Sequence, residues 1–205
     1  MHIEILSDKQ KQLLPFLKKY KRVYYLVGGT AIGFHIGHRH SIDFDLFTDT
    51  KINFTNIKKE VSITGFHSSV IHSSADQIHF IINEVKLTFF EFPFSIQCSS
   101  NFEDYCRMPD LITLSAMKAF ALGGRGKWKD YVDLYFIIKN FYSIEEIAAK
   151  TKEIFQDVFN PILFRKQICY FNDIDYSQTV EYLPGFETEE SVIKDFLTEA
   201  ALTGF

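Results

Sequence analysis

The sequence predicts an α+β protein in which an α/β unit is followed by a helical half. Two observations support this class. Polar and apolar residues alternate over 42–47 and 77–82, which is the period of a strand with one face on a core. After Pro109 the pattern changes to one typical of amphipathic helices. We therefore expect an α/β core over residues 1–108 and a C-terminal helical region, packed on that core, over residues 109–205.

Local patterns predict each element of the N-terminal half. The segment 7–20 carries apolar residues among charges, which predicts an amphipathic helix capped by Ser7 or Asp8, although Pro15 disfavours its continuity. The other elements expected here are a strand at 23–27, a helix at 30–38, a strand at 42–47, a helix at 52–61 and strands at 63–73, 77–83 and 85–92, with a hairpin turn at Asn83-Glu84.

The C-terminal half is expected to be helical throughout, apart from a polar loop over 173–190. Ser143 and Glu146 have the spacing of a capping box, which predicts a helix start at that point. The remaining expected helices lie at 110–122, 127–140, 162–170 and 189–200, and glycines at 123, 124 and 126 separate the first two.

Composition limits the classes of function. The chain is 46% hydrophobic with a formal net charge of −4, so it has a substantial core and no global signature of a nucleic-acid binder. A local basic cluster at 18–22 fits either a polyanion contact or a solvated helix face. The three cysteines form no Cys-x-x-Cys pair, which fits a reducing cytoplasm. No apolar run approaches the ~20 residues of a membrane span, and no signal peptide is visible, so a cytoplasmic protein without a membrane partner is expected.

The most informative feature is the pair Asp43 and Asp45 in the predicted strand 42–47. On a strand these two side chains point to the same face, roughly 6–7 Å apart. Carboxylates that close repel each other unless a proton or a cation lies between them. A hard divalent cation such as Mg²⁺ prefers oxygen ligands, so the pair predicts a metal site. The alternative is the solvated face of an edge strand.

A second feature, Gly28-Gly29-Thr30, follows an apolar run and predicts a strand, a tight turn and a helix that begins near Thr30. Glycines allow a ligand to approach the backbone closely, and the N-terminus of a helix favours an anion such as phosphate. A turn without a ligand is the alternative. Together with the acid pair, this turn indicates binding of a nucleoside triphosphate and its metal.

Two longer stretches resemble one family. The stretch 26–31, Leu-Val-Gly-Gly-Thr-Ala, is followed by 37–47, Gly-His-Arg-His-Ser-Ile-Asp-Phe-Asp-Leu-Phe. The second stretch combines Lys118 with Arg125-Gly126-Lys127, Asp130 and Asp133. These motifs resemble the nucleotidyltransferase toxins of the AbiEii/AbiGii type, which are similar to the DNA polymerase β-like nucleotidyltransferase superfamily. The resemblance covers about residues 10–140.

The resemblance implies a minimal nucleotidyltransferase fold with a mixed sheet flanked by helices. It implies transfer of a nucleotidyl group from an NTP, with one or two Mg²⁺ ions, to an acceptor that is tRNA in some of these toxins. It also implies a partner antitoxin protein. The implied catalytic residues are Asp43, Asp45, Lys118 and Asp130, with Asp133 as a second candidate beside Asp130. The implied metal ligands are Asp43 and Asp45. The implied nucleotide-binding residues are Gly28, Gly29, Thr30, Ser41, Arg125 and Lys118. For Lys118, Arg125 and Asp130, the alternative is a solvated helix face. One residue of 38–40, His-Arg-His, is a further candidate for contact with phosphate or RNA.

The chain departs from the superfamily pattern at one position. A third carboxylate is expected on a neighbouring strand, but that position holds Thr88. Glu91 lies three residues further on and faces the opposite side unless a bulge turns it back. Asp76 and Glu84 are poorer substitutes because they are expected in loops. The options are a one-metal enzyme, a different base, or a binding protein without turnover. A catalytically degenerate nucleotide- or partner-binding protein and a small-molecule nucleotidyltransferase of the antibiotic-modifying kind are therefore the alternative functions.

Overall fold

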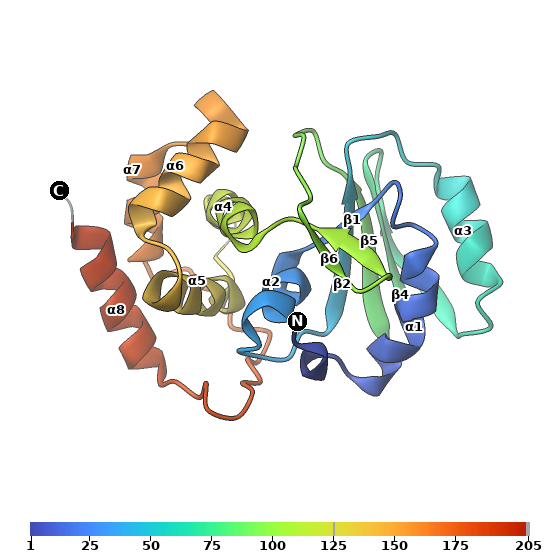
Figure 1. Ribbon diagram of the computed structural model, residues 1–205, viewed down its shortest axis with the longest axis horizontal. Helices are drawn as coiled ribbons and strands as arrows, with labels where there is room; N and C mark the ends of the chain where they lie inside the picture. Colours follow the sequence, from blue (N-terminus) through green and yellow to red (C-terminus); the bar gives the residue numbers. More distant parts are fainter. Residues whose placement is uncertain (125, 204–205) are drawn as a thin grey trace. The chain divides into compact units, whose positions relative to one another are not determined.

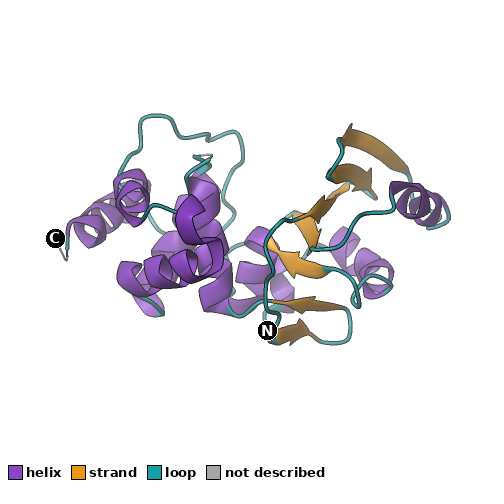
Figure 2. Ribbon diagram, turned by 90° about the horizontal axis from the view of Figure 1, so that it is seen from above, coloured by secondary structure: helices purple, strands orange, loops and turns teal. Residues whose placement is uncertain are grey.

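The computed structural model describes residues 1–124 and 126–203, and the chain divides into two compact units, residues 1–110 and 111–205 (Figure 1). The named strands of the described chain all belong to the first unit, and the second unit is built from helices and loops (Figure 2). The predicted α+β class, with a mixed sheet flanked by helices, is confirmed.

The first unit is organised around a seven-stranded sheet in the order β3-β4-β5-β2-β1-β7-β6. The sheet is mixed because β2 pairs with β5, and β1 with β7, in parallel, whereas the other pairs are antiparallel. The strands are β1 Tyr25–Val27, β2 Asp43–Thr48, β3 Ser68–Ser73, β4 Gln77–Ile82, β5 Val85–Glu91, β6 Ser100–Phe102 and β7 Cys106–Met108.

The register of the sheet places one row of side chains across five strands. Val27 is opposite Asp45, Asp45 is opposite Thr88, Thr88 is opposite His79, and His79 is opposite His72. Residues that are opposite each other in adjacent strands share a face of the sheet. The acid pair of β2 therefore belongs to a face that continues across β5 and β4 to β3.

The opposite face of the sheet forms the core of the first unit. Its central side chains are at most 2% exposed: Phe44, Leu46, Phe80, Leu87 and Phe89. The rings of Tyr20 and Tyr24 pack edge-on against Phe89, with centroids 4.9 and 5.2 Å away. Figure 1 shows α1 (Asp8–Lys18) and α3 (Phe54–Ser62) on one side of the sheet and α2 (Gly28–Ile36) on the other. The alternation of β2 thus separates an apolar core from a polar face.

Helix α1 begins as predicted and continues through its proline. Ser7 is the N-cap and forms a capping box with Gln10, so Ser7 rather than Asp8 is the cap. Pro15 lies inside the helix with its side chain exposed, while its neighbours Leu14 and Phe16 are buried. The helix ends at Lys18, two residues before the predicted end. Burial of the apolar stripe therefore outweighs the local cost of the proline.

Several boundaries differ from those predicted. Strand β1 begins at Tyr25 and β3 at Ser68, and the strands β6 and β7 were not predicted. Each is only three residues long and lacks a clear alternation, so they depend on pairing with each other and, for β7, with β1 rather than on local pattern. The hairpin at Asn83-Glu84 is confirmed, and both residues have positive φ, 52° and 64°, as a type I′ turn requires.

The second unit contains α4 (Leu111–Leu122), α5 (Trp128–Asn140), α6 (Ile144–Phe155), α7 (Pro161–Ile168) and α8 (Glu190–Leu202). Short 3-10 turns lie at Gln156–Val158 here and at Ile3–Ile5 in the first unit. The capping box of Ser143 and Glu146 is confirmed. The loop before α8 is anchored by backbone hydrogen bonds, since Trp128 N donates to Asp175 O at 3.1 Å and Asp175 N donates to Gly126 O at 2.7 Å.

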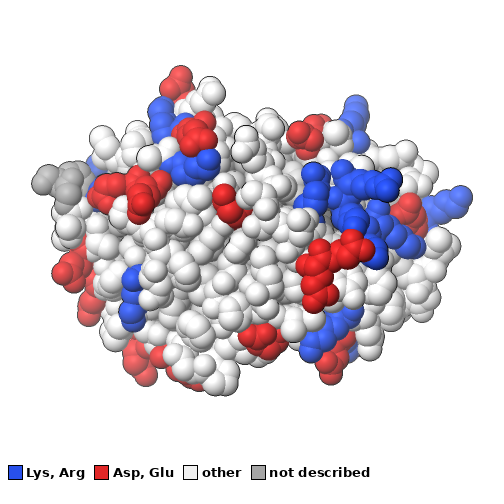
Figure 3. Space-filling model, viewed as in Figure 1, with Lys and Arg blue, Asp and Glu red and all other residues white. Residues whose placement is uncertain are grey.

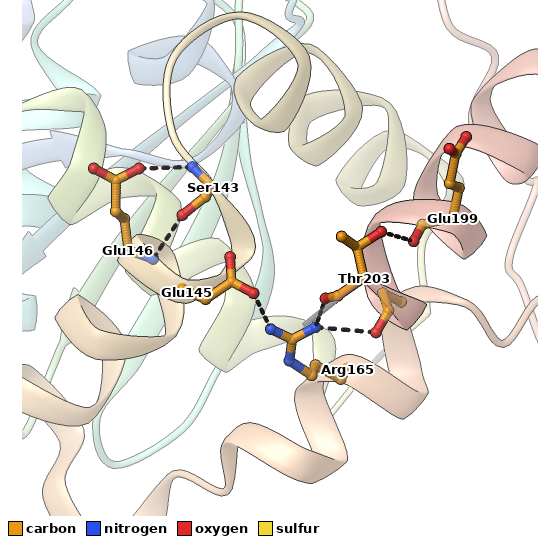
Figure 4. Close-up of polar contacts among 7 residues, drawn as sticks. Ser143, Glu145, Glu146, Arg165, Glu199 and Thr203 are labelled. Carbon is orange, nitrogen blue, oxygen red and sulfur yellow. Dashed lines mark hydrogen bonds and ion pairs between the residues drawn. The ribbon is translucent and has the colours of Figure 1, made fainter. Parts of the chain in front are cut away.

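Arg165 connects three helices of the second unit (Figure 4). Its guanidinium on α7 forms an ion pair with Glu145 in the first turn of α6. It also donates to the backbone carbonyls of Ala201 at 3.0 Å and Thr203 at 2.9 Å, at the end of α8. Carbonyls at a helix C-terminus lack intrahelical donors, so this arginine satisfies two of them and ties α8 to α7.

Candidate active site

The carboxylates of β2 lie against the glycine turn that precedes α2. Asp43 and Asp45 are both half-buried on the polar face of the sheet. A Cβ atom added to Gly28 would lie 2.6 Å from Oδ2 of Asp45, so the carboxylate is in direct contact with the backbone of the turn. The structure therefore brings together the two motifs that the sequence places more than a dozen residues apart.

The turn itself exposes the N-terminus of a helix. Helix α2 begins at Gly28, with Val27 as the N-cap, and Val27 has no side-chain oxygen that could accept from the first turn. Gly28 has φ of +74°, a conformation that only glycine adopts readily. Uncapped N–H groups and the positive end of the helix dipole favour an anionic ligand at this position.

Thr30 and Ser41 brace the turn against β2. Thr30 donates its hydroxyl hydrogen to the backbone carbonyl of Asp43, and the Oγ atoms of Thr30 and Ser41 are 2.7 Å apart. Both residues are buried. The expectation that the helix begins at Thr30 was wrong: the helix begins two residues earlier, because the glycines themselves form its first turn. The hydroxyl of Thr30 instead fixes the start of the strand that carries the acids.

Arg39 places a positive charge beside the glycine turn. The sequence alone did not distinguish it from its two histidine neighbours. Its guanidinium lies against Gly29, where an added Cβ would collide with Nη2. Nη1 donates to the carbonyl of His40 at 3.0 Å, and the side chain is only 3% exposed. His40 is turned elsewhere, with Nδ1 donating to the carbonyl of Ile5 at 3.1 Å, and His38 is fully buried. Of the three residues considered together, Arg39 is thus the one beside the turn.

The third carboxylate is not supplied by any of the residues considered for it. Thr88 lies opposite Asp45, is 5% exposed, and its Oγ1 has no hydrogen-bond partner in the described part of the chain. The register between β2 and β5 is unbroken from Lys86 to Glu91, so no bulge returns Glu91 to the face of the acids.

The two loop acids are engaged elsewhere. Asp76 accepts from Ser74 Oγ at 2.7 Å, and Glu84 forms an ion pair with Lys9. Within residues 1–124 and 126–203, no group of three or more His, Cys, Asp or Glu side chains is arranged to hold a metal ion. On this face, Asp43 and Asp45 could supply carboxylate oxygens to a cation, a donor set that suits a hard ion which keeps several waters, such as Mg²⁺.

The predicted residues of the second unit form a separate buried cluster. Lys118 Nζ on α4 lies 2.7 Å from Asp130 Oδ1 and 2.9 Å from Asp133 Oδ2, both on α5. The three side chains are at most 6% exposed. Spacing of three residues places both aspartates on one helix face, as expected. Lys118 and Asp130 are therefore buried and do not lie on a solvated helix face, which was the alternative. Arg125 lies outside the described residues.

The basic cluster at the end of α1 lies beside acidic side chains (Figure 3). Lys18 and Lys21 both form ion pairs with Asp104 in the turn between β6 and β7. These contacts lower the pKa of the Asp104 carboxyl to about 2, chiefly through the hydrogen bonds from the two lysines. A hollow of about 560 Å³ adjoins them, lined by Lys21, Arg22, Asn101, Glu103, Asp104, Cys106 and Arg107. Part of the basic charge is therefore neutralised within the protein.

No family model matches the sequence. An uncharacterised protein of Aquifex aeolicus (strain VF5) is 29% identical over 178 residues, which cover 83% of this chain and 84% of that protein. No helix in the described residues has both the length and the apolar character needed to cross a bilayer.

Three solved structures are similar over nearly the whole chain. A candidate nucleotidyltransferase from H. pylori is 17% identical with a TM-score of 0.61, covering 96% of this chain and 94% of that one. JHP933 from Helicobacter pylori is 16% identical with a TM-score of 0.61, covering 98% and 91%. MenT4, a nucleotidyltransferase toxin from Mycobacterium tuberculosis H37Rv, is 12% identical with a TM-score of 0.66, covering 94% and 80%. The chain therefore has a nucleotidyltransferase-like fold.

Proposed function

We propose that this protein is a Mg²⁺-dependent nucleotidyltransferase that transfers a nucleoside monophosphate from an NTP to a hydroxyl group of an acceptor. The observation that carries the proposal is the contact between the Asp45 carboxylate and the Gly28 backbone at the start of α2. In this contact a carboxylate, which suits a cation, lies beside a helix N-terminus, which suits an anion. A nucleoside triphosphate with its metal has both charges that such a site would bind.

For each site residue of the first unit we propose a role based on its position. Asp43 and Asp45 would hold Mg²⁺, which when bound supplies positive charge to offset the charge that develops on the reacting phosphate. The first turn of α2, at Gly28 and Gly29, would bind the terminal phosphates through its backbone N–H groups. Thr30 and Ser41 would act by holding this turn against β2. Arg39, buried beside Gly29, would add a fixed positive charge at the same turn.

We also propose Lys118 as a contact of the triphosphate, as the motif resemblance implies. Asp130 and Asp133 hold its ammonium group, so it is ordered before any nucleotide binds. An ordered cation needs less reorganisation when a triphosphate arrives than a freely rotating one. Asp130 would therefore act by positioning Lys118, with Asp133 as a second positioning group, and Arg125 remains a predicted nucleotide contact.

RNA, and tRNA in particular, is the acceptor that we propose, and the protein would be the toxin of a toxin–antitoxin pair. The motif resemblance and the fold shared with MenT4, a nucleotidyltransferase toxin, support this choice. Thr88 at the position of an expected carboxylate favours one alternative, a nucleotide-binding relative without turnover. A small-molecule acceptor is the other alternative.

The test is incubation of the protein with Mg²⁺, each α-labelled NTP and total RNA. We expect label in RNA with the wild type and a loss of about 100-fold or more in Asp45→Asn, since an electrostatic contribution of this kind is typically that large. Asp49→Asn is the matched control, because Asp49 is an exposed carboxylate just beyond the end of β2. Equal labelling by the wild type and Asp45→Asn would contradict the proposal.

The same assay separates the alternatives. NTP binding without transfer would support the nucleotide-binding relative, and label on a small amine or alcohol would support the small-molecule enzyme. Induced expression in bacteria tests the toxin role, for which we expect growth arrest by the wild type and normal growth with Asp45→Asn.

A further inference from the structure

We propose that His79 on β4 is the base that accepts the proton of the acceptor hydroxyl. This inference rests on the proposed function and adds a catalytic residue to it. It answers a question that the site leaves open, because Asp43 and Asp45 are assigned to the metal and Thr88 cannot accept a proton at neutral pH. A hydroxyl that attacks phosphorus must lose its proton to some group in the site.

The register of the sheet places His79 in the row of the acids. Thr88 lies directly opposite Asp45 on one side and directly opposite His79 on the other. All three side chains therefore point from the same face, with His79 about 9–10 Å from Asp45 across two strand spacings. Between them lies the unpartnered hydroxyl of Thr88. An acceptor hydroxyl bound on this face between β2 and β4 would thus lie between the metal ligands and the imidazole.

The hydrogen bond of His79 leaves Nδ1 of its ring available to accept a proton. Nε2 of His79 lies 2.8 Å from Oε1 of Gln77, the side chain two residues earlier on the same strand. An amide oxygen only accepts, so Nε2 carries the hydrogen in this contact and Nδ1 carries the lone pair. The ring of His72 on β3 packs beside that of His79, with centroids 5.0 Å apart and planes tilted by 55°. His79 is thereby oriented from two sides.

The surroundings keep the imidazole of His79 neutral and basic near pH 7. Burial lowers the pKa of His79, and electrostatic interactions with Lys86 on β5 and His72 on β3 lower it further. Asp45 on β2 opposes them by favouring the protonated form. The net shift is downward, so below neutral pH the imidazole becomes protonated and can no longer accept a proton.

The proposed step is balanced in atoms and charge. The oxygen of the acceptor hydroxyl forms a bond to the α-phosphorus of the NTP, and its proton passes to Nδ1 of His79. The bond between the α-phosphorus and the oxygen bridging to the β-phosphate breaks, and pyrophosphate leaves with that electron pair. The imidazolium then returns its proton to solvent.

The first test compares His79→Asn with His67→Asn. Both replace an imidazole with a smaller polar side chain, but His67 is an exposed residue just before β3 and only His79→Asn removes the proposed base. We expect kcat to fall by about 100-fold or more in His79→Asn, as is typical for loss of a general base, with KM for the NTP unchanged. The fall in rate at acidic pH seen with the wild type should disappear in this variant. His67→Asn should keep at least half of the wild-type kcat. A wild-type kcat in His79→Asn would overturn the inference.

The second test places a carboxylate in the row instead. In the double variant Thr88→Asp/His79→Asn, a new base stands directly opposite Asp45, so we expect kcat to recover at least tenfold over His79→Asn. Proton NMR provides a readout that does not depend on turnover: the imidazole signal of His79, assigned through its loss in His79→Asn, should titrate below the ordinary pKa of a histidine. Failure of recovery together with an unshifted titration would overturn the inference.

The two proposals can fail separately. A wild type that transfers no label to any acceptor overturns the proposed function, and the inference with it. An active wild type, lost in Asp45→Asn but unchanged in His79→Asn, overturns the inference alone.

Discussion

At the scale of the residue, the site depends on a glycine that brings a backbone close to a carboxylate. Gly28 combines a positive φ with the absence of a side chain that would occupy the space of Asp45 Oδ2. The first property alone is shared by Gly65, with φ of +79° and no atom within 4 Å of an added Cβ. A comparison of Gly28 with Gly65 therefore separates the free-energy cost of the backbone conformation from the cost of the contact with Asp45.

We expect Gly28→Ala to destabilise the protein more than Gly65→Ala. Both variants place a side chain in the left-handed region, at a cost of about 1–2 kcal/mol. Only Gly28→Ala also forces the Asp45 carboxylate to move. The free energy of unfolding in urea measures the difference, and the affinity for an NTP should fall in Gly28→Ala alone. Equal losses of stability and unchanged NTP affinity in the two variants would show that the contact has no role.

At the scale of the element, local patterns predicted those strands and helices that are stabilised locally. The alternation of β2 and β4, the caps at Ser7 and Ser143, and the turn at Asn83-Glu84 are all legible in the sequence. The strands β6 and β7 are not, because three residues carry no period and their stability comes from pairing with each other and with β1. The start of α2 was misplaced because a glycine pair normally precedes a helix rather than beginning it.

Pro15 disfavours the helix in which it lies, and a substitution should remove this destabilisation. It lies within α1 and removes one backbone hydrogen bond from the helix interior, which costs about 3 kcal/mol. Part of this cost is offset because proline restricts the unfolded chain by about 0.4–1 kcal/mol. We expect Pro15→Ala to raise the free energy of unfolding by about 2 kcal/mol, measured in urea.

Pro161 is the matched control for Pro15, since it lies at the first position of α7, where its missing N–H has no intrahelical partner. Pro161→Ala should therefore give no gain in stability. A Pro15→Ala variant no more stable than the wild type would show that Pro15 does not destabilise α1.

Breaking the buried cluster between α4 and α5 should strongly destabilise the second unit. Removal of Lys118 leaves two carboxylates without their cation in a nearly dry environment. We expect Lys118→Met to destabilise the protein by about 3–5 kcal/mol.

Lys150→Met is the matched control for Lys118→Met, because the ion pair of Lys150 with Glu153 lies on the surface of α6 and should be worth less than about 0.5 kcal/mol. Thermal unfolding distinguishes the two variants. Similar melting temperatures would mean that the buried charges are not paired as described.

At the scale of the whole molecule, the part of the candidate site that could be predicted is the part that is local in sequence. Gly28, Asp43 and Asp45 belong to one strand–helix–strand segment, so their meeting follows from a short connection. His79 reaches the same face only through the order β4-β5-β2, which no local pattern reveals. Arg39 lies in a loop whose path is set by packing. The order of the strands brings residues that are distant in sequence to the same site, and this order could not be predicted from local patterns in the sequence.

The central claim is that Asp43 and Asp45 jointly hold a cation that carries a triphosphate at the start of α2. Its most direct test is calorimetric titration of an NTP into the wild type and into Asp43→Asn/Asp45→Asn, each with and without Mg²⁺. We predict that Mg²⁺ tightens NTP binding by about tenfold or more in the wild type and has no effect in the double variant, since its ligands are gone. An equal effect of Mg²⁺ on both proteins would contradict the claim.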